Sequence, residues 1–168
     1  NSAPGAVIVD GTGTGTNTAN VPGTILISEL RTSGPGGAGD DFVEIYNNTD
    51  TPHTVPAGGY GLFKSGADCN ATPVLVGTIP ASTVIPQRGH YLFVGSTYSL
   101  TAYAGANAVL TTDIESDFNV GLFMTVDPLQ VSTANRLDAV GFGNNTVGVC
   151  ALLVEGSTLS SALGSTSE

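Results

Sequence analysis

The sequence contains no tryptophan, a single methionine and only four lysine and arginine residues among its 168 residues. Against these bases stand 14 aspartate and glutamate residues, which give a formal net charge of −10 at pH 7. A field of this sign repels a phosphate backbone, so we expect no direct binding of nucleic acid. The four bases are scattered along the chain and form no basic patch: Arg31, Lys64, Arg88 and Arg136.

Cysteine, histidine and long apolar runs are also scarce. Cys69 and Cys150 lie too far apart for a Cys-x-x-Cys zinc or redox motif, so each is either a buried small hydrophobe or half of a disulfide. His53 and His90 stand far apart as well, and we interpret them as ordinary residues rather than a zinc pair. No run approaches the roughly 18 apolar residues of a membrane span, so we expect no membrane insertion.

Two stretches rich in β-branched or aromatic residues, 24–30 and 41–47, are bounded by Gly, Pro, Asn or Asp, as strands are. The segment between them, residues 31–40, is too rich in glycine for a helix. The simplest interpretation is an antiparallel pair in which each strand carries one glutamate, Glu29 and Glu44. We interpret the glycine-rich segment as a mobile loop of the kind that often grips partners.

Similar short runs, separated by turn signals, continue along the chain. They predict an all-β sandwich of about eight or nine strands. At most one short helical turn is expected, over residues 99–104, where Ser99 could cap it. The further predicted strands are residues 60–65, 74–79, 83–85, 90–95, 120–126, 135–142 and, as a possible last strand, 149–154.

Composition divides the chain into three parts. Residues 1–20 contain a Gly-Thr repeat and are predicted to be a flexible linker, although the apolar island at 6–9 could add an edge strand. Residues 21–156 form the predicted domain, and residues 157–168 form a flexible tail of Ser, Thr and Gly. A polar surface built from Thr, Ser and Asn, with only 11% charged residues, suits an extracellular β domain.

Oxygen-bearing side chains alternate along residues 113–119. In an extended segment this spacing places Asp113, Glu115, Asp117 and Asn119 on one side, where they could converge on Ca²⁺ or instead form a solvated loop. The pattern is not an EF-hand, because Phe118 and Met124 occupy the positions that need Gly and Glu. The pair Glu29 and Glu44 could in principle hydrolyse a glycoside, but ordinary hydrogen bonding is the expected role.

Five short motifs, in order, resemble the lamin tail domain family, specifically its bacterial secreted members. Ile27-Ser-Glu-Leu30 and Phe42-Val-Glu-Ile-Tyr-Asn47 match the opening "I-x-E-I … F-V-E-L-x-N". The other three are Val55 to Leu62, Ile79-Pro-Ala81 through Leu92, and Asp138-Ala-Val-Gly-Phe-Gly143. In the first of these three, Tyr60 stands at the family's tryptophan position and needs a partner for its hydroxyl. The resemblance implies an immunoglobulin-like sandwich and a binding or structural role, with no catalytic residues and no required cofactor.

Three functional hypotheses follow. The leading one is a non-enzymatic interaction module of an extracellular or surface-located bacterial protein, with a protein or envelope component as partner. The second is a Ca²⁺- or carbohydrate-binding module, which the 113–119 oxygens and the net charge favour. The third, from family habit, is an accessory domain of a larger secreted nuclease or phosphatase.

Overall fold

The glutamate-bearing pair predicted from the sequence begins one of two stacked sheets. In the computed structural model, which describes residues 23–66, 68–143 and 145–159, β1 (Ile25–Arg31) pairs antiparallel with β2 (Phe42–Asn47), and Glu29 lies opposite Glu44. A β-bulge interrupts β1 between Ile27 and Glu29. The sheet order is β1-β2-β7-β8, completed by β7 (His90–Val94) and β8 (Ala108–Val109), which runs parallel to β7.

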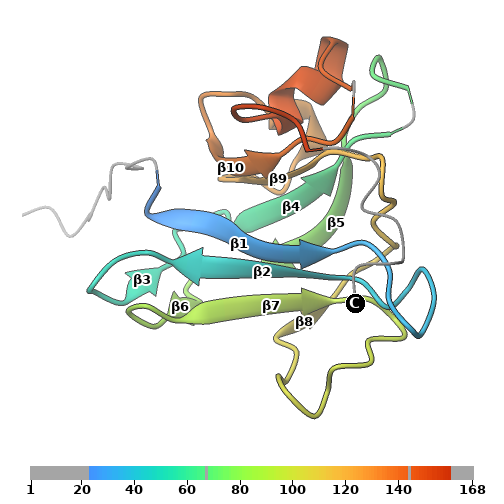
Figure 1. Ribbon diagram of the computed structural model, residues 1–168. Helices are drawn as coiled ribbons and strands as arrows, with labels where there is room; N and C mark the ends of the chain where they lie inside the picture. Colours follow the sequence, from blue (N-terminus) through green and yellow to red (C-terminus); the bar gives the residue numbers. More distant parts are fainter. Residues whose placement is uncertain (1–22, 67, 144, 160–168) are drawn as a thin grey trace, which may run out of the picture.

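The second sheet lies above the first in Figure 1 and is antiparallel throughout. Its order is β10-β9-β4-β5, made of β10 (Arg136–Val140), β9 (Val120–Phe123), β4 (Tyr60–Lys64) and β5 (Val74–Ile79). A small ribbon joins β3 (His53–Thr54) to β6 (Val84–Ile85). The edge strands β1 and β10 of the two main sheets lie next to each other (Figure 1).

The core fills the space between the two sheets. Val43 and Ile45 of β2 point into it, and Leu62 and Leu122 meet them from the other sheet, all with no exposed surface. Because side chains alternate along a strand, Glu44, which lies between Val43 and Ile45, points to the outer face of its sheet. Each large side chain buried here stabilises the fold by about 1.5–3 kcal/mol.

The structure confirms an all-β sandwich with almost no helix, and it corrects the prediction for the end of the chain. Residues 149–154 are not a strand, because the 3-10 helix η2 (Gly148–Leu153) occupies this position. A short apolar run fits a buried helix as well as a strand, and Gly148 starts the helical turn with a φ of 53°. A second 3-10 helix, η1 (Pro128–Gln130), lies in a connection.

Two short strands were not expected, β3 and β8. Each has two residues, too few for a pattern of alternation to show. In the segment expected to hold a helical turn, the amides of Tyr103 and Ala104 both donate to the Leu100 carbonyl, but the Ser99 side chain caps nothing there and bonds to Asp40 instead.

The contacts of the sandwich extend past the predicted boundary at residue 156. Leu159 forms a parallel bridge with Phe142, in which its amide donates to the Gly141 carbonyl and its carbonyl accepts from Gly143. The predicted linker at 1–20, its apolar island and residues 160–168 lie outside the described residues. Among the residues that the structure describes, no helix is long and apolar enough to cross a membrane.

Candidate functional site

The outer face of the sheet β1-β2-β7-β8 carries aromatic and charged side chains in a row. Since Val43 and Ile45 point into the core, Glu44 and Tyr46 point outward from β2. Tyr46 lies opposite His90 of β7, and their ring centroids are 4.9 Å apart. The sequence motif marked residues 42–47 as a strand, but only the structure shows that Tyr46 and His90 meet on an open face.

Glu44 stands at the middle of this row. Its Oε1 accepts a hydrogen bond from the Ser28 hydroxyl (2.7 Å), and its Oε2 lies 3.4 Å from Nδ1 of His90. Its cross-strand neighbour is the exposed Glu29. Two like charges directly opposite each other weaken a strand pair. The pairing of Glu29 with Glu44 therefore destabilises the contact between β1 and β2 when no external cation is bound.

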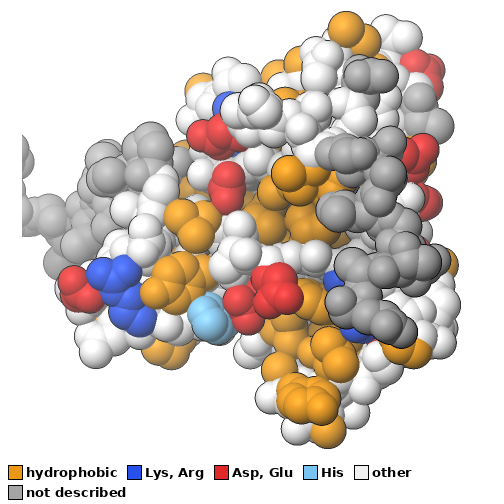
Figure 2. Space-filling model, in the orientation of Figure 1, with side chains coloured by type: hydrophobic (Ala, Val, Ile, Leu, Met, Phe, Trp, Pro, Cys, Tyr) orange, Lys and Arg blue, Asp and Glu red, His pale blue; other side chains and the backbone are white. Residues whose placement is uncertain are grey.

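Arg88 extends the row at the end near β3. Its Nε donates to Oδ1 of Asp50 (2.9 Å) and its Nη1 donates to Oδ1 of Asn48 (2.8 Å). Hydrogen bonding to Asp50, and then to Tyr46, raises the pKa of Arg88. The residue has a φ of 51°, which is unusual for a residue with a side chain. Figure 2 shows red, blue, orange and pale blue side chains following one another across this face.

A shallow hollow opens beside this row, between the edge strands β1 and β10. It has a volume of about 210 Å³. Figure 2 shows hydrophobic side chains gathered there, between the two strands, with acidic side chains next to them. The hollow is lined by Ile27, Ser28, Glu29, Leu30, Val140 and Leu159.

Asp138 joins the two edge strands β1 and β10. Its Oδ2 accepts a hydrogen bond from the amide of Ile27 on β1 (2.7 Å), and its Oδ1 accepts one from the amide of Ala139 on β10 (2.8 Å). Burial raises the pKa of Asp138. The carboxylate therefore occupies edge amides that would otherwise be available to another strand.

The glycine-rich segment 31–40 is fastened to the sandwich through Asp40. Asp40 is fully buried and accepts hydrogen bonds from the Gly36 amide (2.9 Å), from the amide and hydroxyl of Ser99, and from the Arg31 guanidinium. Burial alone raises its pKa, but these bonds and the Arg31 charge outweigh burial and lower the pKa of Asp40 below its usual value.

The next residue, Asp41, has a different environment. It is also fully buried, and its Oδ2 accepts from the Ile114 amide (2.6 Å), whereas its Oδ1 has no hydrogen-bond partner and lies against Gly95. Burial raises the pKa of Asp41 despite the hydrogen bond from Ile114.

The four candidate calcium ligands have separate contacts. Glu115 accepts from the buried Lys64 ammonium (2.6 Å), which also donates to the backbone carbonyl of Asp113 (2.6 Å). The backbone carbonyl of Asp117 accepts from Asn145, and the Asn119 side chain is buried elsewhere. Among the described residues no group of three or more His, Cys, Asp and Glu side chains could hold a metal ion, so the calcium site stays a prediction without support from the geometry.

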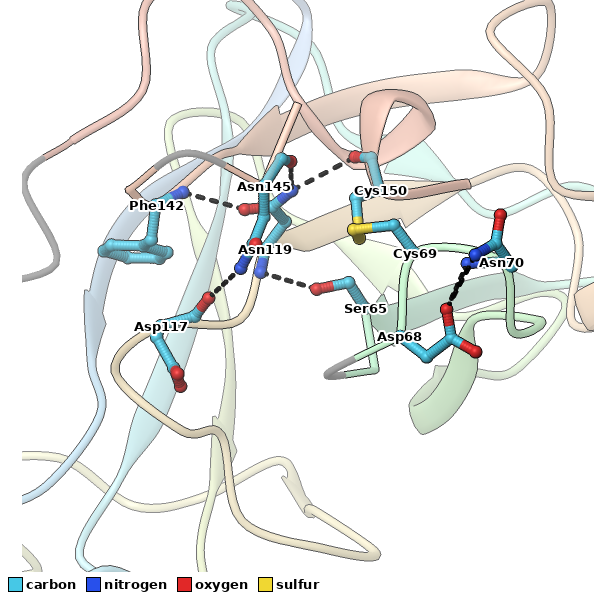
Figure 3. The surroundings of a disulfide bond; sticks show 9 residues. All are labelled: Ser65, Asp68, Cys69, Asn70, Asp117, Asn119, Phe142, Asn145 and Cys150. Carbon is cyan, nitrogen blue, oxygen red and sulfur yellow. Dashed lines mark hydrogen bonds between the residues drawn. A yellow bond between two sulfur atoms is a disulfide. The ribbon is translucent and has the colours of Figure 1, made fainter. Parts of the chain in front are cut away.

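Asn119 and a disulfide together hold Asn145 and the 3-10 helix η2 in place (Figure 3). Cys69 and Cys150 are bonded with an S–S distance of 2.09 Å, which confirms the disulfide alternative. The side-chain Nδ2 of Asn119 donates to the backbone carbonyls of Asn145 (2.6 Å) and Cys150 (3.1 Å), and its Oδ1 accepts from the backbone amide of Phe142 (2.8 Å). Asn119 is therefore structural, since its side-chain donors and acceptor are occupied by backbone groups.

The two histidines have separate roles. His53 Nε2 lies 2.7 Å from the hydroxyl of Tyr60, and this contact supplies the partner that Tyr60 was expected to need. Burial raises the pKa of Tyr60 to about 12 and lowers the pKa of His53. His90 lies on the outer face beside Glu44 instead.

Comparison with known proteins leaves the exposed face as the main guide to function. No protein-family model matches this chain, and a search of curated proteins found no match.

Proposed function

We propose that this chain is a non-enzymatic interaction module of a secreted or cell-surface bacterial protein, and that it binds a protein or envelope component through the outer face of β1-β2-β7-β8. The observation that carries the proposal is a row of outward-facing side chains, called here the exposed row: Glu44 and Tyr46 are half-buried, and Arg88 and His90 are exposed. Tyr and Arg are the residues most often found at the centre of binding surfaces.

The location outside the cytosol is supported by the disulfide. Such bonds form and persist mainly in oxidising environments, and the bond between Cys69 and Cys150 holds together segments that are 81 residues apart in sequence. The bacterial source depends on the family resemblance alone.

We propose membership of the lamin tail domain family as well. Two of its motifs, which lie at opposite ends of the matched region, meet in space, because Ile27 of the first donates its amide hydrogen to Asp138 of the last (2.7 Å). The glutamates of the first two motifs, Glu29 and Glu44, are cross-strand neighbours. Shared contacts of this kind are a reason for the motifs to occur together.

The test is a binding measurement with the chain immobilised in its oxidised form. Purified envelope fractions and secreted proteins are passed over the wild type and over Tyr46→Ala, with Tyr103→Ala as the matched control on an exposed loop tyrosine. We expect saturable binding that Tyr46→Ala weakens at least fivefold and Tyr103→Ala leaves unchanged. The wild type could also hydrolyse p-nitrophenyl glycosides or bis-p-nitrophenyl phosphate. If it does, and Glu29→Gln or Glu44→Gln abolishes this activity, the non-enzymatic assignment is contradicted.

Carbohydrate binding is a second candidate for the same face. The Tyr46 ring can pack against the C–H face of a sugar, and the Glu44 carboxylate beside it can accept hydrogen bonds from hydroxyl groups. A glycan array separates the two candidates, because a defined glycan that binds the wild type but not Tyr46→Ala would replace a protein partner with a sugar.

A further inference from the structure

The hollow between β1 and β10 combines an apolar lining with one carboxylate. Ile27, Leu30, Val140 and Leu159 supply the apolar part, and Glu29 stands at its wall. Its volume of about 210 Å³ is far above the roughly 15 Å³ that one water needs, but below the roughly 300 Å³ at which pockets for small-molecule ligands begin. The space is therefore suited to a single side chain contributed by a partner.

Among the residues that the structure describes, no Lys or Arg side chain pairs with Glu29. All four basic side chains are paired with other carboxylates, namely Arg31 with Asp40, Lys64 with Glu115, Arg88 with Asp50 and Arg136 with Glu155. Glu44, the cross-strand neighbour, adds a second negative charge. A cation from outside the chain would relieve the repulsion between these two glutamates.

Lysine and arginine are the side chains that meet both requirements. Each carries an aliphatic stem, which is stable on apolar surface, and a cationic head, which pairs with a carboxylate. We propose that the β1–β10 hollow, which adjoins the interaction surface proposed above and rests on the same proposed function, receives a lysine or arginine side chain from an extended segment of a partner protein. The stem packs on Leu30, Val140 and Leu159, and the head binds Glu29.

The experiment uses the full chain, labelled with ¹⁵N, and three capped hexapeptides in 50 mM salt. Each peptide carries one variable residue between two valines: lysine, norleucine, which keeps a stem without charge, or 2,3-diaminopropionic acid, which keeps the charge on a short stem. We expect the lysine peptide to bind at least tenfold more tightly than the other two, with amide shifts confined to residues 27–30, 140 and 159.

Two variants locate the site. Glu29→Gln should weaken the lysine peptide at least fivefold, and Leu159→Ser, which changes a half-exposed side chain while keeping the backbone bridge to Phe142, should weaken it at least threefold. The matched control Asp117→Asn removes an exposed negative charge away from the hollow and should have no effect.

Several outcomes would overturn the inference. These are equal affinity for all three peptides, shifts spread over the whole surface, equal effects of Glu29→Gln and Asp117→Asn, or the absence of saturable shifts. If the immobilised chain still binds its envelope partner while Glu29→Gln leaves binding of the lysine peptide unchanged, the docking site is wrong and the proposed function stands. If no partner binds but the lysine peptide does so at this site, the proposed function fails by itself.

Discussion

Asp40 and Asp41 are consecutive and both fully buried, yet their surroundings shift their pKa values in opposite directions. Asp40 receives hydrogen bonds from two loops and from Arg31, which favour its ionised form, whereas one oxygen of Asp41 has no partner. The sequence shows two identical side chains here, so their difference could not be predicted: it depends on contacts with Ser99 and Ile114, far away along the chain.

Asp40→Asn should therefore destabilise the protein most at neutral pH. Because the pKa of Asp40 is lowered from 3.8 in the folded state, its contribution is present above about pH 4 and is lost as the pH falls through the folded-state pKa. We expect a loss of about 1.5–3 kcal/mol at pH 7 that shrinks toward pH 3. Urea unfolding curves across this range measure it; an equal loss at both pH values would contradict the role of charge.

Asp41→Asn provides the opposite dependence on pH. Since the pKa of Asp41 is raised in the folded state, its ionised form opposes folding, and this cost disappears as the pH falls below the folded-state value. The wild type should gain stability relative to Asp41→Asn as the pH is lowered from 7. A difference in unfolding free energy that is constant with pH would show that folding does not raise the pKa of Asp41.

At the scale of strands, the sequence predicted most of the architecture. β-Branched residues and turn signals marked the segments that form the antiparallel pair of β1 and β2. They also marked the segments that form β4, β5, β7, β9 and β10. The failure at 149–154 arose because an apolar run of six residues does not distinguish a strand from a helix. There the disulfide and the hydrogen bond from Asn119 to Cys150 hold η2 in place.

The junction between β7 and the glycine-rich loop depends on close backbone approach. Gly95 donates its amide hydrogen to the Asp41 carbonyl (2.8 Å), and a Cβ at this position would overlap Oδ1 of Asp41 and the carbonyl of Gly39. We expect Gly95→Ala to cost about 1–3 kcal/mol, as overpacking does. Gly105→Ala is the control, since no atom lies within 4 Å of its added Cβ, and thermal unfolding compares the two.

If Gly95→Ala unfolds at the same temperature as Gly105→Ala, the loop can move aside at no cost. The close packing around Asp41 would then be unimportant for stability.

For the whole molecule, the sequence predicted the sandwich but little of the candidate site. The residues of the exposed row come from β2, β7 and the turn before β7, and Arg88 appeared in the sequence only as one scattered base. The hollow likewise brings residues 27–30 next to residues 140 and 159. Such juxtapositions depend on how two edge strands meet, which local patterns do not encode.

The disulfide should contribute strongly to the stability of the whole fold. A bridge between positions 81 residues apart restricts the unfolded chain by about 4 kcal/mol in the chain-entropy estimate. We expect dithiothreitol to lower the guanidinium midpoint of the wild type and to leave the Cys69→Ser/Cys150→Ser double variant, which is already destabilised, unchanged. Equal midpoints for oxidised and reduced wild type would contradict this.

Calcium is expected to leave the protein unchanged. Glu115 is paired with Lys64, and the Asn119 side chain binds backbone groups, so ligation by these residues would first break existing contacts. The melting temperature should be the same in millimolar CaCl₂ and in EDTA. A rise with calcium that Asp117→Asn removes would restore the metal site predicted from the sequence.

The bond between Cys69 and Cys150 spans the exposed loop at residues 101–107. A protease that cuts the backbone once within this loop would leave two fragments that remain covalently joined and paired within the same sheets. The nicked protein would migrate as two pieces only after a thiol reductant is added. The molecule can thus persist as a two-chain protein where proteases are present, with its exposed row and both edge strands still attached.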